Sequence, residues 1–296
     1  MSGILVFVMS CYGLAILLSL VIGFTGGHES PLIGMAYLSM FLPAAAVVLV
    51  NRTRNEPPRV HWTSFPMRYF PIALFLIPGV LHAVMLPVMA QLGGGVRWQE
   101  WLTPRADGLF QVPAPRGWGT LTLQGLVAHI LVNAVFGLLI VSLLALFEEI
   151  GWRAWLLPRL TIRIGARWGV ILTSAIWALW HVPFLLSGIQ HIDGVSAIKL
   201  ALTIPLGIMA TGVILGWLWW RTESIWLVAI AHGASNNWGQ YAFKYMRDSG
   251  WPDREMLALT LGSLALLLVG VVLLWRATDF AHISTATASP GGTARS

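Results

Sequence analysis

Long apolar stretches separated by short polar ones run through most of the chain. Eight of them approach the ~20 residues that an α-helix needs to cross a bilayer. They predict helices near residues 3–24, 31–50, 70–92, 121–147, 168–188, 197–219, 224–242 and 256–275. Neither a repeat nor a soluble domain interrupts this pattern. We therefore predict an all-α, polytopic transmembrane helix bundle over residues 1–282, followed by a small polar tail, 283–296, that is disordered.

The composition agrees with a membrane protein and excludes several other classes. Hydrophobic residues make up 57% of the chain and charged residues only 10%, whereas globular chains average ~45–50% and ~25%. This excludes a soluble enzyme, a disordered protein and a nucleic-acid-binding domain. The single cysteine, Cys11, excludes an intramolecular disulfide and a Cys-based zinc site. The apolar run continues past Cys11 to Val21, which favours a retained first span over a removed signal peptide.

The basic residues are distributed unevenly between alternate loops. The loops after the second, fourth, sixth and eighth stretches carry 11 Lys and Arg residues, and the other set carries 7. Cytoplasmic loops are enriched in Lys and Arg. We therefore predict a multi-pass protein of the cell membrane with the first set of loops and both termini in the cytoplasm.

The loop over residues 93–119 is rich in Gly, Pro and Trp and has no apolar periodicity. We expect Trp98, Trp101 and Trp118 to lie at the membrane surface, where indole rings are favoured. An interfacial loop is the first interpretation, and a lid or substrate-facing element is the alternative.

Two adjacent carboxylates, Glu148 and Glu149, end the longest uncharged run of the middle stretches. A charge at mid-membrane costs ~2.5–3.5 kcal/mol on insertion scales, so such residues are functional candidates. Glu149 and Arg153 have the i, i+4 spacing of an ion pair on one helix face. Glu148 points about 100° away and is left free to act elsewhere. The alternative is a helix that ends in a solvated charge cluster.

Two histidine motifs follow on later stretches. His181 lies in an uncharged span, one turn after Trp177, and Pro183 loosens the helix there. His232 and Asn236 are again i and i+4, so both polar groups share a face. Each motif has a simpler alternative, a hydrogen-bonded core histidine or an interhelical hydrogen-bond pair.

Two further histidines are assigned outside this group. His129 lies about 28 Å from Glu148 along its own helix, at ~1.5 Å per residue, so we interpret it as a packing residue. No residue near His82 in the sequence gives it a partner, so His82 is also not assigned to the candidate site.

Together the three motifs supply the groups that hydrolysis requires. A Glu and a His can hold and deprotonate a water molecule, and a second His with an Asn can donate hydrogen bonds to an oxyanion. The same residues equally match a His₂Glu zinc site formed by Glu148, His181 and His232. The sequence lacks the helical His-Glu-x-x-His pattern, so a metal is possible without being required.

The order and spacing of these motifs over residues 147 to 237 resemble the CPBP intramembrane protease family, which includes the type II CAAX prenyl endopeptidases and bacterial Abi proteins. The resemblance implies that Glu148 is the general base with His181, and that His232 and Asn236 form the oxyanion hole. It also implies that Glu149 and Arg153 position the first group. The second motif usually opens with Phe, and here it opens with Trp177.

The resemblance implies an intramembrane endopeptidase that hydrolyses a peptide bond in a membrane-associated protein or peptide without a cofactor, with Zn²⁺ as the alternative. Membrane lipids and that substrate would be its partners, and no nucleic acid is expected. A non-catalytic membrane scaffold or immunity protein is the second hypothesis. A transporter ranks third, because transporters usually contain internal repeats.

Overall fold

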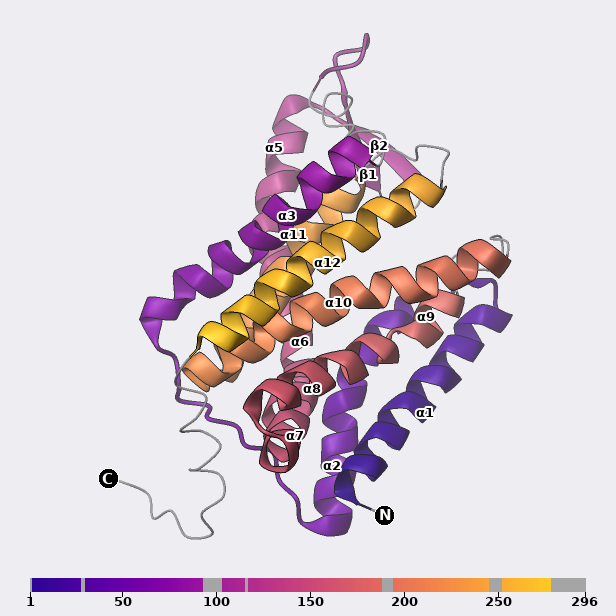
Figure 1. The fold of residues 1–296 in the computed structure, drawn as a ribbon. Coiled ribbons are helices and arrows are strands. Elements are labelled where there is room, and N and C mark those ends of the chain that lie inside the picture. The colour runs from indigo at the N-terminus through magenta and orange to yellow at the C-terminus, as the bar shows by residue number, and fades with distance from the viewer. Residues whose placement is uncertain are drawn as a thin grey trace.

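The computed structural model describes residues 2–27, 30–92, 103–114, 117–187, 194–244 and 252–277. Helices of very different lengths pack side by side in this part of the chain, and a small hairpin lies at one end of the bundle (Figure 1). The α-helices are α1 (Gly3–Phe24), α2 (Leu42–Arg54), α3 (Ile77–Leu92), α5 (Leu123–Val132), α6 (Leu138–Gly151), α7 (Leu157–Ile164), α8 (Ala166–Trp180), α9 (Val182–Ser187), α10 (Gly194–Thr222), α11 (Ile225–Lys244) and α12 (Pro252–Arg276).

Shorter elements connect or interrupt these helices. Two are 3₁₀ segments and three are π-helical turns, which add a residue to a helix and are frequent at functional sites. They are the 3₁₀ segments η2 (Ile33–Phe41) and η3 (Met67–Tyr69), and the π turns η4 (Ile72–Leu76), η5 (Asn133–Gly137) and η6 (Trp152–Leu156). The hairpin pairs β1 (Phe110–Ala114) with β2 (Gly117–Leu121) in antiparallel fashion.

Seven segments of the described chain are long and apolar enough to cross a membrane. They are Gly3–Phe24, Ile33–Arg54, Met67–Met85, Leu123–Ile164, Ala166–Ser187, Ala201–Thr222 and Leu257–Arg276. The predicted all-α, polytopic bundle is therefore confirmed, and the chain is a multi-pass membrane protein. The predicted eighth stretch, 224–242, does form a helix, α11, but is not among the seven. Its His, Ser, Asn and Gln side chains lower its mean hydropathy.

The helix predicted over 121–147 does not end at the two carboxylates. Helical structure continues through Glu148 and Glu149 as far as Ile164, with π turns at η5 and η6. Glu148 is 3% exposed and Glu149 is 0% exposed. The alternative of a solvated charge cluster at a helix end is therefore wrong.

The predicted irregular loop over 93–119 contains regular structure in its second half. Residues 110–114 and 117–121 pair as the hairpin, in the register Val112 opposite Gly119. Residues 93–102 and the side chains of Trp98, Trp101 and Trp118 lie outside the described part, as does the predicted tail, 283–296. Their predicted roles stay predictions.

Small residues bring the central helices into close contact, as is usual between helices in a membrane. Gly233 of α11 packs directly against the backbone of Ser142 in α6, and Gly212 of α10 packs against Ser174 and Trp177 of α8. A side chain larger than hydrogen at either glycine would overlap the neighbouring helix. This packing places α6, α8, α10 and α11 around one buried region.

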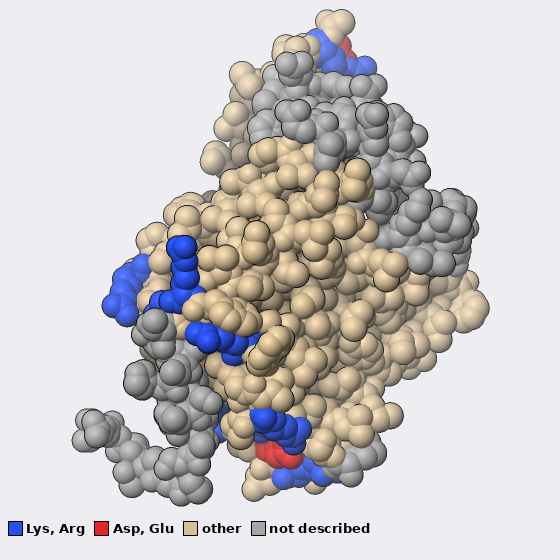
Figure 2. All heavy atoms as spheres, in the orientation of Figure 1, with Lys and Arg blue, Asp and Glu red and all other residues tan. Residues whose placement is uncertain are grey.

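Charge is concentrated towards the ends of the molecule. Lys and Arg side chains gather towards the lower end of the face in Figure 2, and a broad band without charge covers its middle. The end of α2, the turn between α7 and α8, and the ends of α10 and α12 all lie in the lower half of Figure 1. These are loops of the more basic set, so the prediction that they share one side agrees with the fold.

Candidate active site

The predicted ion pair between Glu149 and Arg153 is confirmed. Glu149 lies near the end of α6, Arg153 lies in η6, and Nη1 of Arg153 donates to Oε1 of Glu149 over 2.9 Å. Nη2 of the same guanidinium donates to the carbonyl of Gly212 in α10 over 3.3 Å. Arg153 is 1% exposed. The pair is therefore part of the bundle interior, where removing one partner would leave a buried charge uncompensated.

The Glu149 carboxylate has a second partner on α11. Nδ1 of His232 lies 2.7 Å from the same Oε1 atom of Glu149, and the His232 side chain is 2% exposed. Because an ionised carboxylate only accepts hydrogen bonds, Nδ1 of His232 carries the hydrogen. One carboxylate thus joins its own helix turn to a helix that follows much later in the chain.

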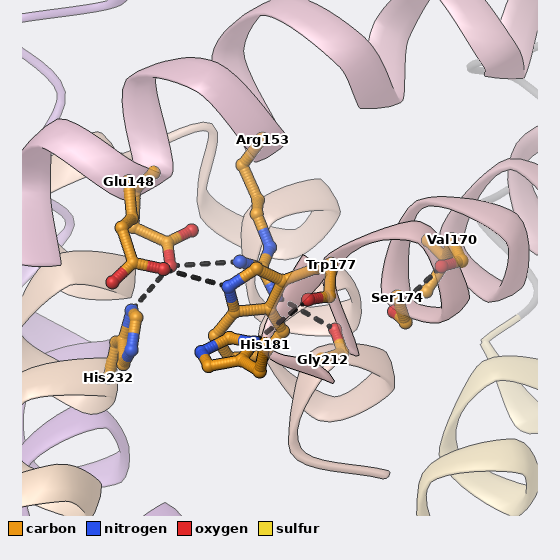
Figure 3. A network of polar contacts seen from close by, with 9 residues as sticks. Glu148, Arg153, Val170, Ser174, Trp177, His181, Gly212 and His232 are labelled. Carbon is orange, nitrogen blue, oxygen red and sulfur yellow. Dashed lines mark hydrogen bonds and ion pairs between the residues drawn. The ribbon is translucent and has the colours of Figure 1, made fainter. Parts of the chain in front are cut away.

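The Glu148 carboxylate is held by Trp177 of α8. The indole Nε1–H of Trp177 donates to Oε2 of Glu148 over 2.8 Å. The indole also meets the rings of His181 and His232 edge to face, with centroid separations of 5.5 Å and 5.1 Å. The Arg153 guanidinium lies 4.6 Å from the centroid of the indole ring. Figure 3 shows Trp177 between the carboxylates and His181.

His181 stands at the end of α8, where the helix loosens. Its Nδ1 lies 2.9 Å from the backbone carbonyl of Trp177. A carbonyl cannot donate, so Nδ1 carries the hydrogen, and Nε2 of the neutral ring is the acceptor. His181 is only partly buried. Its ring therefore presents an accepting nitrogen at the edge of the buried cluster.

Asn236 lies one turn after His232 on α11, as predicted, but differs from it in environment. Its side chain is exposed, whereas His232 and the adjacent Asn237 are buried. Nδ2 of Asn237 donates to the carbonyl of Asn133 in η5 over 2.9 Å. The structure therefore brings together Glu148, Glu149, Arg153, Trp177, His181 and His232, and it leaves Asn236 beside this cluster.

The zinc alternative receives no support from the donor arrangement. Within the described residues, no three His, Cys, Asp or Glu side chains are placed to hold a metal ion together. Glu148 and Glu149 are each turned towards a Trp or an Arg and His instead. We derive no step through a metal.

The two histidines assigned outside the site, His82 and His129, make contacts within their own helical segments. Nδ1 of His82 contacts the carbonyl of Pro78 at 2.5 Å. The carbonyl of His129 accepts from Nδ2 of Asn133 over 2.8 Å. The packing role of His129 and the omission of His82 stay predictions.

Two functional contacts were not predicted from the sequence, namely the one between Glu149 and His232 and the one between Trp177 and Glu148. From the sequence, Trp177 was noted only as the aromatic residue that opens the second motif. An indole is also a hydrogen-bond donor, and a buried indole N–H usually finds an acceptor. The presence of this indole donor in the same motif region as the two carboxylates was therefore the sequence signal that could have pointed to the contact with Glu148.

Comparison with known proteins gives a match to a family model and a match to a curated relative. Residues 130–238 match a family model described as type II CAAX prenyl endopeptidase Rce1-like. A stretch of 98 residues is 33% identical to the CAAX prenyl protease 2 of Methanococcus maripaludis. This stretch covers 32% of the chain and 36% of that protein. The chain thus spans about a third of the length of the curated relative.

The family match begins in α5 and ends in α11, so it includes every residue of the buried cluster. It agrees with the resemblance carried by the three motifs. Through residues 130–238, the chain is similar to the type II CAAX prenyl endopeptidases of the Rce1-like family.

Proposed function

We propose that the protein is an intramembrane endopeptidase that hydrolyses a peptide bond with a water molecule activated by Glu148 and His181. The observation that carries the proposal is the burial of Glu148, 3% exposed, beside two imidazole rings and next to a neighbouring carboxylate that is already paired. An unpaired carboxylate is costly inside a bundle and has no evident packing purpose.

In the proposed reaction, a water molecule lies between Glu148 and Nε2 of His181. Its oxygen attacks the carbonyl carbon of the peptide while its proton passes to the Glu148 carboxylate. The C–N bond of the tetrahedral intermediate then breaks, and Glu148 returns the proton to the leaving amine. Positioned acid–base catalysis of this kind contributes typically ~10²–10⁴-fold to a rate.

We propose that His232 and Asn236 donate hydrogen bonds to the oxyanion of the intermediate. Nδ1–H of His232 is held by Glu149, so Nε2 is the nitrogen that faces the substrate. Donation from Nε2 requires a hydrogen on that nitrogen, and Glu149 accepts the hydrogen on Nδ1. The exposed amide of Asn236 is accessible to a substrate without rearrangement of the buried cluster.

We propose a membrane-associated protein or peptide as the substrate. The name of the curated relative refers to CAAX prenylated proteins, so a chain with a prenylated C-terminal Cys is one candidate. A transmembrane peptide without a lipid is the other. We further propose that the basic end of the molecule, with both termini, faces the cytoplasm.

The test uses the purified protein in lipid vesicles with two quenched-fluorescence reporters, a farnesylated CAAX peptide and a transmembrane peptide library. We expect cleavage of at least one reporter by the wild type and its loss in Glu148→Gln and His181→Ala. The matched control is Glu223→Gln. The Glu223 side chain is 56% exposed, and its Oε2 lies 4.0 Å from Nε2 of His61. Near-normal cleavage by Glu148→Gln would show that Glu148 is not the base, whereas no cleavage by the wild type would favour a non-catalytic scaffold or immunity protein.

A further inference from the structure

We infer that Trp177 is a positioning residue that sets both halves of the water-activating pair, Glu148 through its indole N–H and His181 through its backbone carbonyl. This inference rests on the proposed function. This role differs from simple packing against the site, which any large aromatic ring at position 177 could provide.

The first step is the hydrogen-bond environment of Glu148. A buried carboxylate needs donors to offset the loss of water. In the described part of the chain, the side-chain hydrogen bond that Glu148 accepts is the one from Nε1 of Trp177, at 2.8 Å. A hydrogen bond to a charged acceptor is roughly twice as strong as one between neutral groups. The indole therefore fixes one oxygen of the carboxylate, and the other oxygen is left for water.

The second step is the end of helix α8. In a regular helix the carbonyl of Trp177 would accept the backbone N–H of His181. Here that N–H donates to the carbonyl of Ala178 over 3.2 Å. The Trp177 carbonyl is thereby free to accept Nδ1–H of His181. The same residue thus fixes the tautomer of the histidine and the rotation of its ring.

The third step is the rigidity of the indole itself. Trp177 is 3% exposed, and the Arg153 guanidinium covers its ring at 4.6 Å. Gly212 of α10 lies so close on another side that an added Cβ would be 3.0 Å from Cε3 of Trp177. The ring therefore has no room to turn, so the direction of its N–H is set by the packing of α6, α8 and α10.

A phenylalanine at position 177, the residue that usually opens this motif, would preserve an aromatic ring and the backbone carbonyl. It would remove the N–H together with part of the ring area. Comparison with a control that loses the same ring area therefore isolates the effect of the donor. We expect kcat for the cleaved reporter peptide to fall about 10- to 100-fold, the equivalent of one hydrogen bond to a charged group, while KM changes less than about threefold because substrate contacts are preserved.

The matched control is Trp155→Phe. Trp155 is 0% exposed, and its Nε1–H donates to the carbonyl of Glu56 over 2.8 Å, away from the cluster. It loses the same ring area and an indole hydrogen bond, here to a neutral carbonyl in place of a carboxylate, so thermal stability should fall in both variants. We expect kcat to fall only in Trp177→Phe.

A second measurement applies even if Trp177→Phe folds poorly. Benzothienylalanine at position 177 retains the size of the indole and replaces its N–H by sulfur, and it should lower kcat as Trp177→Phe does. In the wild type, the indole N–H of Trp177, assigned by its absence from the ¹H–¹⁵N spectrum of the substituted protein, should exchange slowly with deuterium. Its resonance should shift in Glu148→Gln and stay in place in Glu223→Gln.

The inference is overturned if benzothienylalanine or Phe at position 177 leaves kcat within about twofold of the wild type, or if the indole resonance ignores Glu148→Gln. Loss of activity in Glu148→Gln combined with full activity in Trp177→Phe would overturn only the inference. Unchanged activity in Glu148→Gln would overturn the proposed function itself. The spectroscopic result stands apart from both, because it requires no substrate.

Discussion

Nδ1 of His232 lies 2.7 Å from Oε1 of Glu149, although 83 residues separate them in the sequence. The same oxygen accepts from Arg153 over 2.9 Å. Glu149 is thus the point at which α11 is fastened to α6. The family resemblance gave Glu149 and Arg153 the task of positioning Glu148. Glu149 contacts His232, and Arg153 covers the ring of Trp177, which donates to Glu148.

Replacement of Glu149 by Gln should lower kcat without unfolding the protein. The amide oxygen can still accept from Arg153 and His232, but a neutral acceptor forms weaker hydrogen bonds than a carboxylate does. We expect kcat to fall about 10-fold or more, with ¹⁵N shifts of His232 that report a weaker Nδ1 hydrogen bond. Glu223→Gln serves as the control. Full activity would mean that His232 needs no charged partner.

Removal of Arg153 alone should cost far more stability than removal of the whole pair. Arg153→Met leaves the Glu149 charge buried with His232 as its remaining partner, a change worth ~3–5 kcal/mol. The double variant Glu149→Leu with Arg153→Met removes both charges, so thermal unfolding in detergent should recover in large part. It should nevertheless remain inactive, since His232 has lost its acceptor. Activity of the double variant would mean that the Glu149–Arg153 pair contributes to stability and not to catalysis.

For comparison, Arg159→Met removes an ion pair with Glu56 whose side chains are 21% and 34% exposed, together with hydrogen bonds to the carbonyls of Trp155 and Pro57. Pairs with such access to solvent contribute only ~0–1 kcal/mol. The unfolding temperature of Arg159→Met should therefore fall less than that of Arg153→Met. A fall as large as that of Arg153→Met would contradict the assignment of the Arg153 effect to burial of its charge.

A methyl group at Gly233 should impair catalysis through the packing of α11. It would lie 2.6 Å from the backbone nitrogen of Ser142, and the backbone of α6 cannot move aside cheaply. Overpacking of this kind costs ~1–3 kcal/mol. Gly233→Ala should therefore lower both the unfolding temperature and kcat, by moving His232 away from Glu149.

Gly13→Ala in α1 is the matched control, because nothing lies within 4 Å of the added methyl group. It should leave stability and kcat unchanged. If Gly233→Ala behaved in the same way, the helix contact at Ser142 would be looser than described.

The two adjacent asparagines of α11 should respond differently to substitution. Asn236 is exposed, so Asn236→Ala should leave stability unchanged and lower kcat, by about 10²–10³-fold if it is an oxyanion donor. Asn237 is buried and bonded to the Asn133 carbonyl. Asn237→Ala should destabilise the protein by about 1–3 kcal/mol. If Asn236→Ala and Asn237→Ala lowered kcat equally and neither lowered stability, the assignment of different roles to the two asparagines would be wrong.

Treatment with a metal chelator should leave cleavage of the reporter peptide unchanged, because Glu148 and His181 are proposed to activate the water directly, and His232 and Asn236 to stabilise the oxyanion. The control is the same dialysis without chelator. Loss of activity that Zn²⁺ specifically restores would favour the site formed by Glu148, His181 and His232.

Contacts within one helix were predictable from the sequence, and contacts between helices were not. The spacing of Glu149 and Arg153 fixed their pairing, because a helix places i and i+4 on one face. Nothing in the spacing of Glu149 and His232 relates them. That contact depends on the close approach of Gly233 to Ser142, and hence on which faces of α6 and α11 meet.

The end of the helix at Glu148 was predicted wrongly for a related reason. Charge was taken as a mark of solvent, because hydropathy sums side chains without regard to their partners. Arg153, Trp177 and His232 supply those partners from three different elements. Polar groups that satisfy one another allow the helix to continue through the interior.

The modest hydropathy of α11, which is not among the apolar spans, bears on how the protein is made. A segment with His and Asn near its centre partitions poorly into lipid on its own during translocon-mediated insertion. α11 packs against α6, and His232 of α11 contacts Glu149 of α6. Biogenesis of this chain should therefore require α6 to be present before α11 leaves the translocon, so that the helix enters the bilayer as a partner of protein rather than as a solute in lipid.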